Sequence, residues 1–283
     1  MYRLIKPDNK IFISEEFKKD KYKFNLILKN LPSSELELYS DEESYIVCRG
    51  SKKWPTWIWT SSSFEKSKLE EIEEVIKLYL TNNERDKFTC KKELYDLLVE
   101  RKFTNLNKED YFEMGFLICH QTKAPKECDG ILSKPTEEDS EVLTKYWYDD
   151  NIEMNGVDPI TLEQAKQDVL NFISDDKFYI LRNSENKIVC MANYSITEEQ
   201  AKINHVYTPV EERKKGYAAN LIYLMTNDIL RRGLVPLLYT DYNYIPSNKA
   251  YINAGYEDKG ILINFSCSKE KKKDEKEELY DNR

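Results

Sequence analysis

The sequence predicts a mixed α/β (α+β) fold, and two observations carry that prediction. Within residues 137–267, short apolar runs typical of strands alternate with stretches whose apolar residues recur at helical spacing. The chain is also longer, at 283 residues, than one hydrophobic core usually organises. We therefore expect a mixed sheet flanked by helices in the C-terminal part, preceded by a smaller α+β domain.

The N-terminal part shows two helical stripes. One covers 64–80 and the other 91–102, because their apolar residues fall on one face of a helix. Apolar runs at 11–13 and 45–48 predict short strands. Nearby, Trp54, Trp57 and Trp59 could line a ligand groove or pack in a core, and packing is favoured because large aromatics mostly supply buried area.

Domain boundaries follow from loop-forming residues and charge. Proline and glycine gather between 121 and 135, where helical and strand periodicity is lost. We therefore predict an N-terminal α+β domain of unknown role at 1–130 and a second domain at 131–267. The last residues, 268–283, are almost all charged and predict a disordered tail.

The second domain has a regular order of predicted elements, with glycines 233 and 255 ending two of its helices. In chain order these are helices at 137–149 and 162–174, strands at 178–182, 188–194 and 202–208, a helix at 215–232, a strand at 236–240, a helix at 247–253 and a final strand after 256.

Composition narrows the classes of function. No apolar stretch is long enough to span a membrane or to form a signal peptide, so a cytoplasmic protein is expected. The net charge of −8 disfavours nucleic acid and slightly favours cationic acceptors. The six cysteines form no CxxC pair and the chain has two histidines, which indicates reduced structural thiols and no metal site.

A strand that stops at Pro209 is followed by a basic loop and then by a long helix. The first turn of a helix leaves four N–H groups unpaired and carries partial positive charge, so it attracts phosphate. Gly216 and Ala218 are small enough to permit close approach, and three cations precede them, namely Arg213, Lys214 and Lys215. Alone, such a loop more often just caps its helix.

Downstream residues add to this signal. The run R-K-K-G-Y-A at 213–218 resembles the Q/R-x-x-G-x-G/A signature of the GNAT N-acetyltransferases, and I-P-S-N-K-A-Y-I-N-A-G-Y at 245–256 resembles that family's second motif. With V-Y-T-P at 206–209, the pattern is similar to a bacterial subgroup with two domains. The resemblance is tightest over 202–256, and the first domain could be a degenerate copy of the same fold.

The resemblance implies an enzyme that transfers an acetyl group from acetyl-coenzyme A to a primary amine by direct attack. It also implies where the cofactor lies: backbone groups of Val206 and Thr208 along the pantetheine arm, amides from Lys214 to Ala218 on the pyrophosphate, and Asn248 on the arm. The complete predicted cofactor-binding set is Val206, Tyr207, Thr208, Arg213, Lys214, Lys215, Gly216, Tyr217, Ala218 and Asn248. Tyr251 would protonate the departing thiolate, or would simply pack in the core.

A protonated amine must lose its proton before it can attack a thioester. Many relatives place a Glu or His on the strand before the signature. Counting back from Val206 by twos places Asn204 on the site-facing side and His205 on the other. We therefore expect Asn204 to position a water, with His205 in the core as the favoured alternative to a catalytic role.

Two other functions stay open at this stage. The protein could bind acyl-coenzyme A as a sensor without catalysis, or act through its N-terminal domain as an interaction module. The acceptor could be a small molecule or a protein amine. The sequence leaves that acceptor, the general base and the oligomeric state undetermined.

Overall fold

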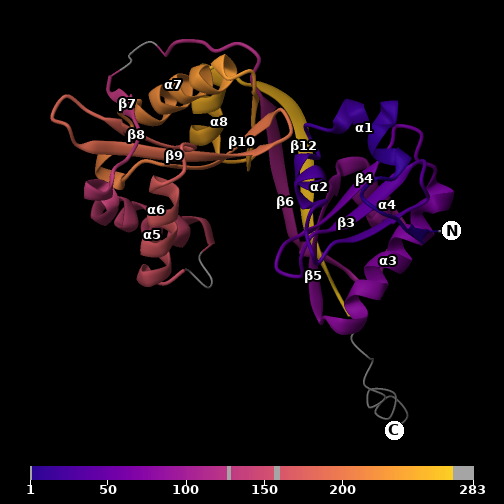
Figure 1. Ribbon diagram of the computed structural model, residues 1–283. Helices are drawn as coiled ribbons and strands as arrows, with labels where there is room; N and C mark the ends of the chain where they lie inside the picture. Colours follow the sequence, from indigo (N-terminus) through magenta and orange to yellow (C-terminus); the bar gives the residue numbers. More distant parts are fainter. Residues whose placement is uncertain (1, 126–128, 156–159, 270–283) are drawn as a thin grey trace, which may run out of the picture. The chain divides into compact units, whose positions relative to one another are not determined.

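The computed structural model describes residues 2–125, 129–155 and 160–269 (Figure 1). The chain divides into two compact units, one formed by 1–113 with 262–283 and the other by 114–261. The predicted disordered tail falls, apart from its first two residues, outside the described residues. No helix in the described part of the chain is both long and apolar enough to cross a membrane.

The first unit has an antiparallel β1-β2-β3-β4 meander, a parallel β4–β5 pair, and residues 262–268 antiparallel to β5. The bounds of the elements are β1 Arg3–Leu4, α1 Glu15–Asp20, α2 Asn25–Asn30, β2 Glu37–Ser40, β3 Tyr45–Arg49, β4 Thr56–Thr60, α3 Leu69–Asn82, β5 Arg85–Lys91, α4 Lys92–Glu100 and β6 Leu106–Ile118.

Several N-terminal predictions can be checked directly. The strand predicted at 45–48 and the helix predicted at 64–80 are confirmed as β3 and α3. The strand predicted at 11–13 is wrong, because Lys10–Ile13 forms a 3-10 turn capped by Asn9. Trp57 and Trp59 are buried on β4, as packing requires, whereas Trp54 is exposed.

The second unit repeats the same order of elements. Its sheet has an antiparallel β7-β8-β9-β10 part, a parallel β10–β11 pair, and residues 114–118 of β6 antiparallel to β11. The bounds are β7 Ile131–Ser133, α5 Ser140–Asn155, α6 Leu162–Ile173, β8 Phe178–Arg182, β9 Ile188–Thr197, β10 Gln200–Tyr207, α7 Tyr217–Arg231, β11 Val235–Asp241, α8 Ile245–Asn253 and β12 Glu257–Ser268.

The two halves of the sequence exchange their last strands. The end of β6, from the N-terminal half, completes the sheet of the second unit at β11, and 262–268 of β12 completes the sheet of the first unit at β5. The predicted boundary at residue 130 and the predicted second domain at 131–267 therefore need correction. The structural boundaries lie within β6 and β12, where composition gives no sign of a linker.

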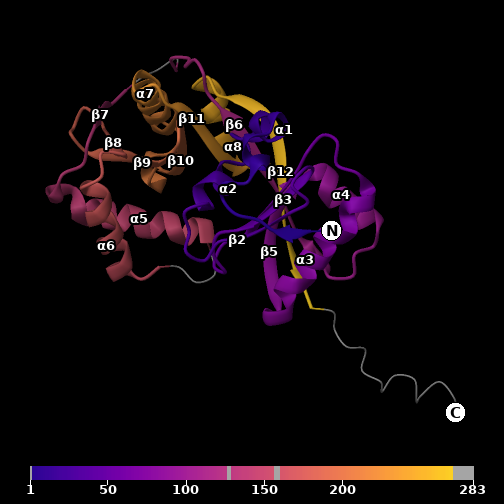
Figure 2. The same cartoon turned by 45° about the vertical axis from the view of Figure 1, so that its right-hand side comes forward.

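Two apolar cores cover the two faces of the second unit's sheet. On one face α7 and α8 pack over residues that include Ala192, Tyr194 and Ile203. On the other face α5 and α6 pack over residues that include Met191 and Tyr207. Figure 2 shows these helix pairs on opposite sides of the strands. The features described next lie around the end of the β10–β11 pair in this unit.

Candidate functional site

Strands β10 and β11 run in parallel only over part of their lengths. Their pairing extends from Gln200–Val235 to Ile203–Leu238, although β10 continues to Tyr207 and β11 to Asp241. Beyond Ile203 each strand pairs with its outer neighbour, β10 with β9 and β11 with β6. The inner edges of both strands therefore leave backbone groups for a ligand at the place where the sequence predicts the pantetheine arm.

The loop after β10 prepares the start of α7 for an anion. Lys214 and Gly216 both have positive φ, at 65° and 86°, so the backbone turns twice just before the helix. Gly216 occupies the N-cap position, where no side chain caps the helix and no acidic residue stands in its first turn. A Cβ at Gly216 would meet no atom of the described residues within 4 Å. The unpaired amides of the first turn thus face open space, as phosphate binding requires.

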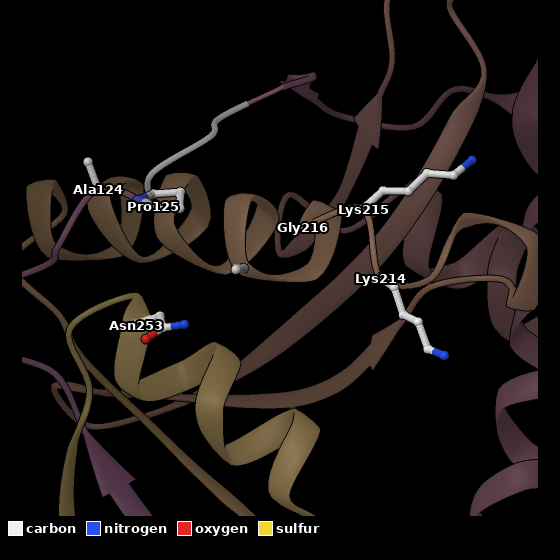
Figure 3. A pocket seen from close by; sticks show the side chains of 7 residues that line it. Ala124, Pro125, Lys214, Lys215, Gly216 and Asn253 are labelled. Carbon is white, nitrogen blue, oxygen red and sulfur yellow. The ribbon is translucent and has the colours of Figure 1, made fainter.

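A cavity of about 510 Å³ lies at this helix start (Figure 3). Lys214, Lys215 and Gly216 form part of its wall, together with Ala219 of α7 and Asn253 of α8. Ligand pockets for small molecules and cofactors commonly have volumes of about 300–1,000 Å³. The cavity therefore has room for the phosphate-bearing part of a nucleotide cofactor beside the uncapped amides.

The three predicted cations differ in what they contact. Arg213 donates through Nη2 to both carboxylate oxygens of Glu153, at 2.6 and 2.7 Å, and through Nε to the Thr208 carbonyl. Lys215 donates to Glu212 at 2.8 Å, and Lys214 makes no ion pair with any described residue. Arg213 thus ties the loop to α5, and of the three side chains Lys214 has its charge most available.

The other residues predicted to bind the pantetheine arm and the pyrophosphate can offer a ligand mainly their backbone groups. Tyr207 and Tyr217 are buried, and Val206 and Ala218 pack their side chains against the α7 core. The Thr208 hydroxyl donates to Cys190 Sγ at 3.2 Å. These contacts leave main-chain groups, not side chains, for a ligand.

Two predicted residues lie on α8. Asn248 donates from Nδ2 to the carbonyls of Asp241 and Tyr242, and its buried Oδ1 has no hydrogen-bond partner among the residues that the structure describes. Burial raises the pKa of Tyr251, and a hydrogen bond from Ser247 opposes that effect more weakly. Tyr251 therefore keeps its proton at neutral pH.

A β-bulge corrects the predicted orientation of Asn204. Ile203 pairs with Tyr194 and Val206 with Ala192, so two residues of β10 oppose Asn193 alone. Alternation fails across this extra residue. Asn204 donates from Nδ2 to Asn193 Oδ1 at 3.1 Å, on the face opposite to the Val206 side chain.

The same bulge turns His205 toward α5. Its Nδ1 lies 2.7 Å from Asp150 Oδ2, and its ring meets the Trp147 indole edge to face at a centroid distance of 4.3 Å. Asp150 is buried, while the His205 side chain stays about a quarter exposed. His205 therefore does not pack in the core as predicted, but lies in a polar and partly exposed position.

Sequence reasoning missed Asp150 and Trp147. The predicted helix stopped at residue 149, but α5 continues to Asn155. Trp147 and Asp150 are three residues apart, so a longer helix puts them on one face. The three-residue spacing could have shown that Trp147 and Asp150 share a helix face. No local feature of the sequence indicates that this face contacts His205.

Comparison with known proteins bears on the fold of the chain. No family model matches the chain, and no curated protein matches its sequence. Among solved structures, a GCN5-related N-acetyltransferase from Sphaerobacter thermophilus aligns over 97% of this chain and 97% of its own, with a TM-score of 0.67 and 14% identity. A GNAT-family acetyltransferase from Colwellia psychrerythraea covers 95% and 100%, with a TM-score of 0.59 and 11% identity.

A third structure, a GCN5-related N-acetyltransferase from Kribbella flavida, covers 90% of this chain and 96% of its own, with a TM-score of 0.58 and 12% identity. Each alignment spans both halves of the chain. At these identities the likeness concerns the fold. The chain has the fold of the GNAT acetyltransferases.

Proposed function

We propose that the protein transfers an acetyl group from acetyl-coenzyme A to a primary amine by direct attack in a ternary complex. The observation that carries the proposal is the separation of β10 and β11 beside the uncapped, glycine-started helix α7. Together they offer an edge for an extended amide-containing arm and an anion site at its end. The fold shared with GNAT acetyltransferases supports the same reading.

The residues present fit the cofactor. Amides from Lys214 to Ala218 would hold the pyrophosphate, with Lys214 adding charge, and main-chain groups of Val206 and Thr208 would hold the arm. Asn248 Oδ1, buried without a partner, would gain a donor from that arm. When bound, the cofactor supplies an activated acyl group as a thioester. Arg213 acts on the loop through Glu153 and is left out of direct binding.

Tyr251 serves as the proton donor to the departing sulfur. Because burial raises its pKa, the phenol is held protonated and can donate. It belongs to the core on the α7–α8 face of the sheet, and His205 contacts α5 on the opposite face. The leaving sulfur and the attacking amine would therefore be served from opposite faces of the opened sheet.

His205 accepts the proton of the amine in this scheme. Asp150 accepts a hydrogen bond from Nδ1–H, which leaves the lone pair of Nε2 to take a proton. Trp147 fixes the ring against α5. Asn204, whose amide donates to Asn193, keeps Oδ1 to position a water that could link the amine to the imidazole.

The alternative is a protein that binds acyl-coenzyme A without turning it over. A sensor needs the anion site and the strand separation, but it needs neither a protonated phenol nor a histidine–aspartate pair. The protonated phenol of Tyr251 and the His205–Asp150 pair therefore both favour the transferase. A role of the first unit as an interaction module would be compatible with either activity.

The test is a panel of amines incubated with the purified protein and acetyl-coenzyme A, with release of free thiol as the readout. The panel includes polyamines, aminoglycosides, amino acids and a lysine-containing peptide. Amine-dependent thiol release supports the transferase. Saturable cofactor binding without release across the panel would favour the sensor, and absence of binding would reject both.

A further inference from the structure

The first unit contains a cavity of about 200 Å³ that the proposed transferase reaction does not use. It lies among β2, β3 and the C-terminal turns of α3, and polar residues dominate its wall. The wall includes Glu37, Arg49, Lys52 and Tyr79, together with Tyr39 and Asn82. The space is several times the roughly 30 Å³ that one water occupies, yet below the usual range for drug-sized ligands.

Two residues that line this cavity each carry a buried polar atom with no hydrogen-bond partner among the described residues. The atoms are Arg49 Nε and the Tyr79 hydroxyl, and their side chains are 3% and 4% exposed. A buried donor without an acceptor destabilises the folded protein, and more so when it is charged. Arg49 lies over the Tyr79 ring at 4.4 Å, so both unpaired groups belong to one cluster.

Arg49 is already held on its other side. Its Nη2 lies 3.1 Å from Asp86 Oδ2, which also accepts from Asn83 Nδ2 at 2.9 Å. Asp86 therefore neutralises and orients the guanidinium while Nε–H remains without an acceptor. Burial raises the pKa of Tyr79, so its hydroxyl stays protonated and can act as a second donor.

The cavity also has one charge of each sign that is not neutralised by a neighbour. Glu37 faces Arg49 in the β2–β3 register, yet Arg49 pairs with Asp86 instead. Lys52 follows β3 at the rim. Within the described parts of the chain, neither Glu37 nor Lys52 forms an ion pair. A ligand that fits must bring an acceptor to Arg49 and Tyr79, and can bring a cation to Glu37.

We propose that this cavity binds a free α-amino acid. Its carboxylate would accept from Arg49 Nε–H and the Tyr79 hydroxyl with Lys52 nearby, and its ammonium group would pair with Glu37. A zwitterion matches the balanced charges better than a simple anion does, because Glu37 repels an anion that brings no positive group. The two orphaned donors gain acceptors in the same step.

The experiment is titration calorimetry of the full chain with each standard L-amino acid, and with acetate and methylamine as the separate halves of the zwitterion. We expect at least one amino acid to bind, and each half alone to bind about tenfold more weakly or worse. Failure of every amino acid to bind would overturn the proposal. Acetate binding as tightly as the best amino acid would do so too.

Three variants locate the site. Glu37→Gln should weaken amino-acid binding about tenfold and leave acetate unaffected or bound more tightly, whereas Glu43→Gln, on an exposed turn outside the cavity, should change neither. Tyr79→Phe keeps the ring beside Arg49 and should weaken binding severalfold, while the ligand-free protein melts no lower than wild type. Wild-type binding in both Glu37→Gln and Tyr79→Phe would exclude the cavity as the site.

Discussion

His205 Nδ1 and Asp150 Oδ2 lie 2.7 Å apart, joining the bulged strand β10 to helix α5. The contact fixes which ring nitrogen carries a hydrogen toward the carboxylate and which one remains for substrate. Trp147, one turn before Asp150, packs on the same ring. A histidine set in this way is oriented as a proton acceptor, and that assignment can be tested separately from cofactor binding.

Replacing His205 with Ala should lower kcat about a hundredfold or more, because general bases typically contribute 10²–10⁴. Asp150→Asn should lower kcat at least tenfold, since the amide no longer favours the productive tautomer. Both rates are measured at saturating acetyl-coenzyme A with a responsive amine.

His120 offers a matched control, since it is exposed and belongs to no part of the proposed machinery. His120→Ala should keep wild-type kcat. A His205→Ala enzyme with more than half of the wild-type kcat would return His205 to a packing role. The proton route would then pass through a water at Asn204.

The sequence predicts the elements of the second unit well, but it does not predict the orientation of every side chain in them. The predicted strand at 178–182 is confirmed as β8, and the helix after Gly216 is confirmed as α7, because both depend on local apolar patterns and on a glycine. Asn204 was placed on the wrong face because one inserted residue reverses the alternation of side chains, and no residue type marks that insertion.

Contacts between distant segments cannot be predicted from the sequence, for a different reason. The exchange of β6 and β12 pairs Phe116 with Tyr239 and Phe265 with Phe88, and each strand alone has a pattern compatible with either partner. The Arg213–Glu153 pair likewise joins residues 60 positions apart. The sequence shows their charges, but the choice of partner is made by the tertiary fold.

Tyr251→Phe should lower kcat roughly a hundredfold with little change in the KM for acetyl-coenzyme A, because the ring remains and only the proton donor is lost. Steady-state kinetics at saturating amine measures both constants. The thiolate leaves without help at a slower rate, so activity should persist. If kcat stays above about half of wild type while chemistry limits the rate, Tyr251 is a packing residue.

Tyr256→Phe is the matched control for Tyr251. The Tyr256 hydroxyl lies 2.8 Å from Thr226 Oγ1 in the same core, and the two tyrosine rings are 6.0 Å apart. Removing this buried hydrogen bond should cost about 1 kcal/mol of unfolding free energy and leave kcat unchanged. The two phenylalanine variants thus separate loss of a core hydroxyl from loss of a proton donor.

The three cations of the loop should differ in their effect on coenzyme A affinity. Lys214→Ala should raise the dissociation constant severalfold and reduce its dependence on salt, because Lys214 forms no ion pair with an acid in the described part of the chain. Arg213→Ala should change the dissociation constant less than threefold. It should lower the melting temperature, since Arg213 binds Glu153 and the Thr208 carbonyl. The opposite ranking, with Arg213 dominant, would show that the arginine leaves Glu153 to bind phosphate.

Gly216→Asp should abolish coenzyme A binding, because its carboxylate would stand where the pyrophosphate needs bare amides at the start of α7. Gly233→Asp supplies a matched control: it also has positive φ, with no atom within 4 Å of an added Cβ, but it follows the C-terminus of the same helix. Both variants carry the same charge and a similar backbone strain, of about 1–2 kcal/mol, but the helix dipole stabilises a carboxylate at the start of α7 and destabilises one after its end, so the melting temperature should fall more in Gly233→Asp. Calorimetry with coenzyme A should find binding in Gly233→Asp alone, and a Gly216→Asp protein that binds within threefold of wild type would place the anion site elsewhere.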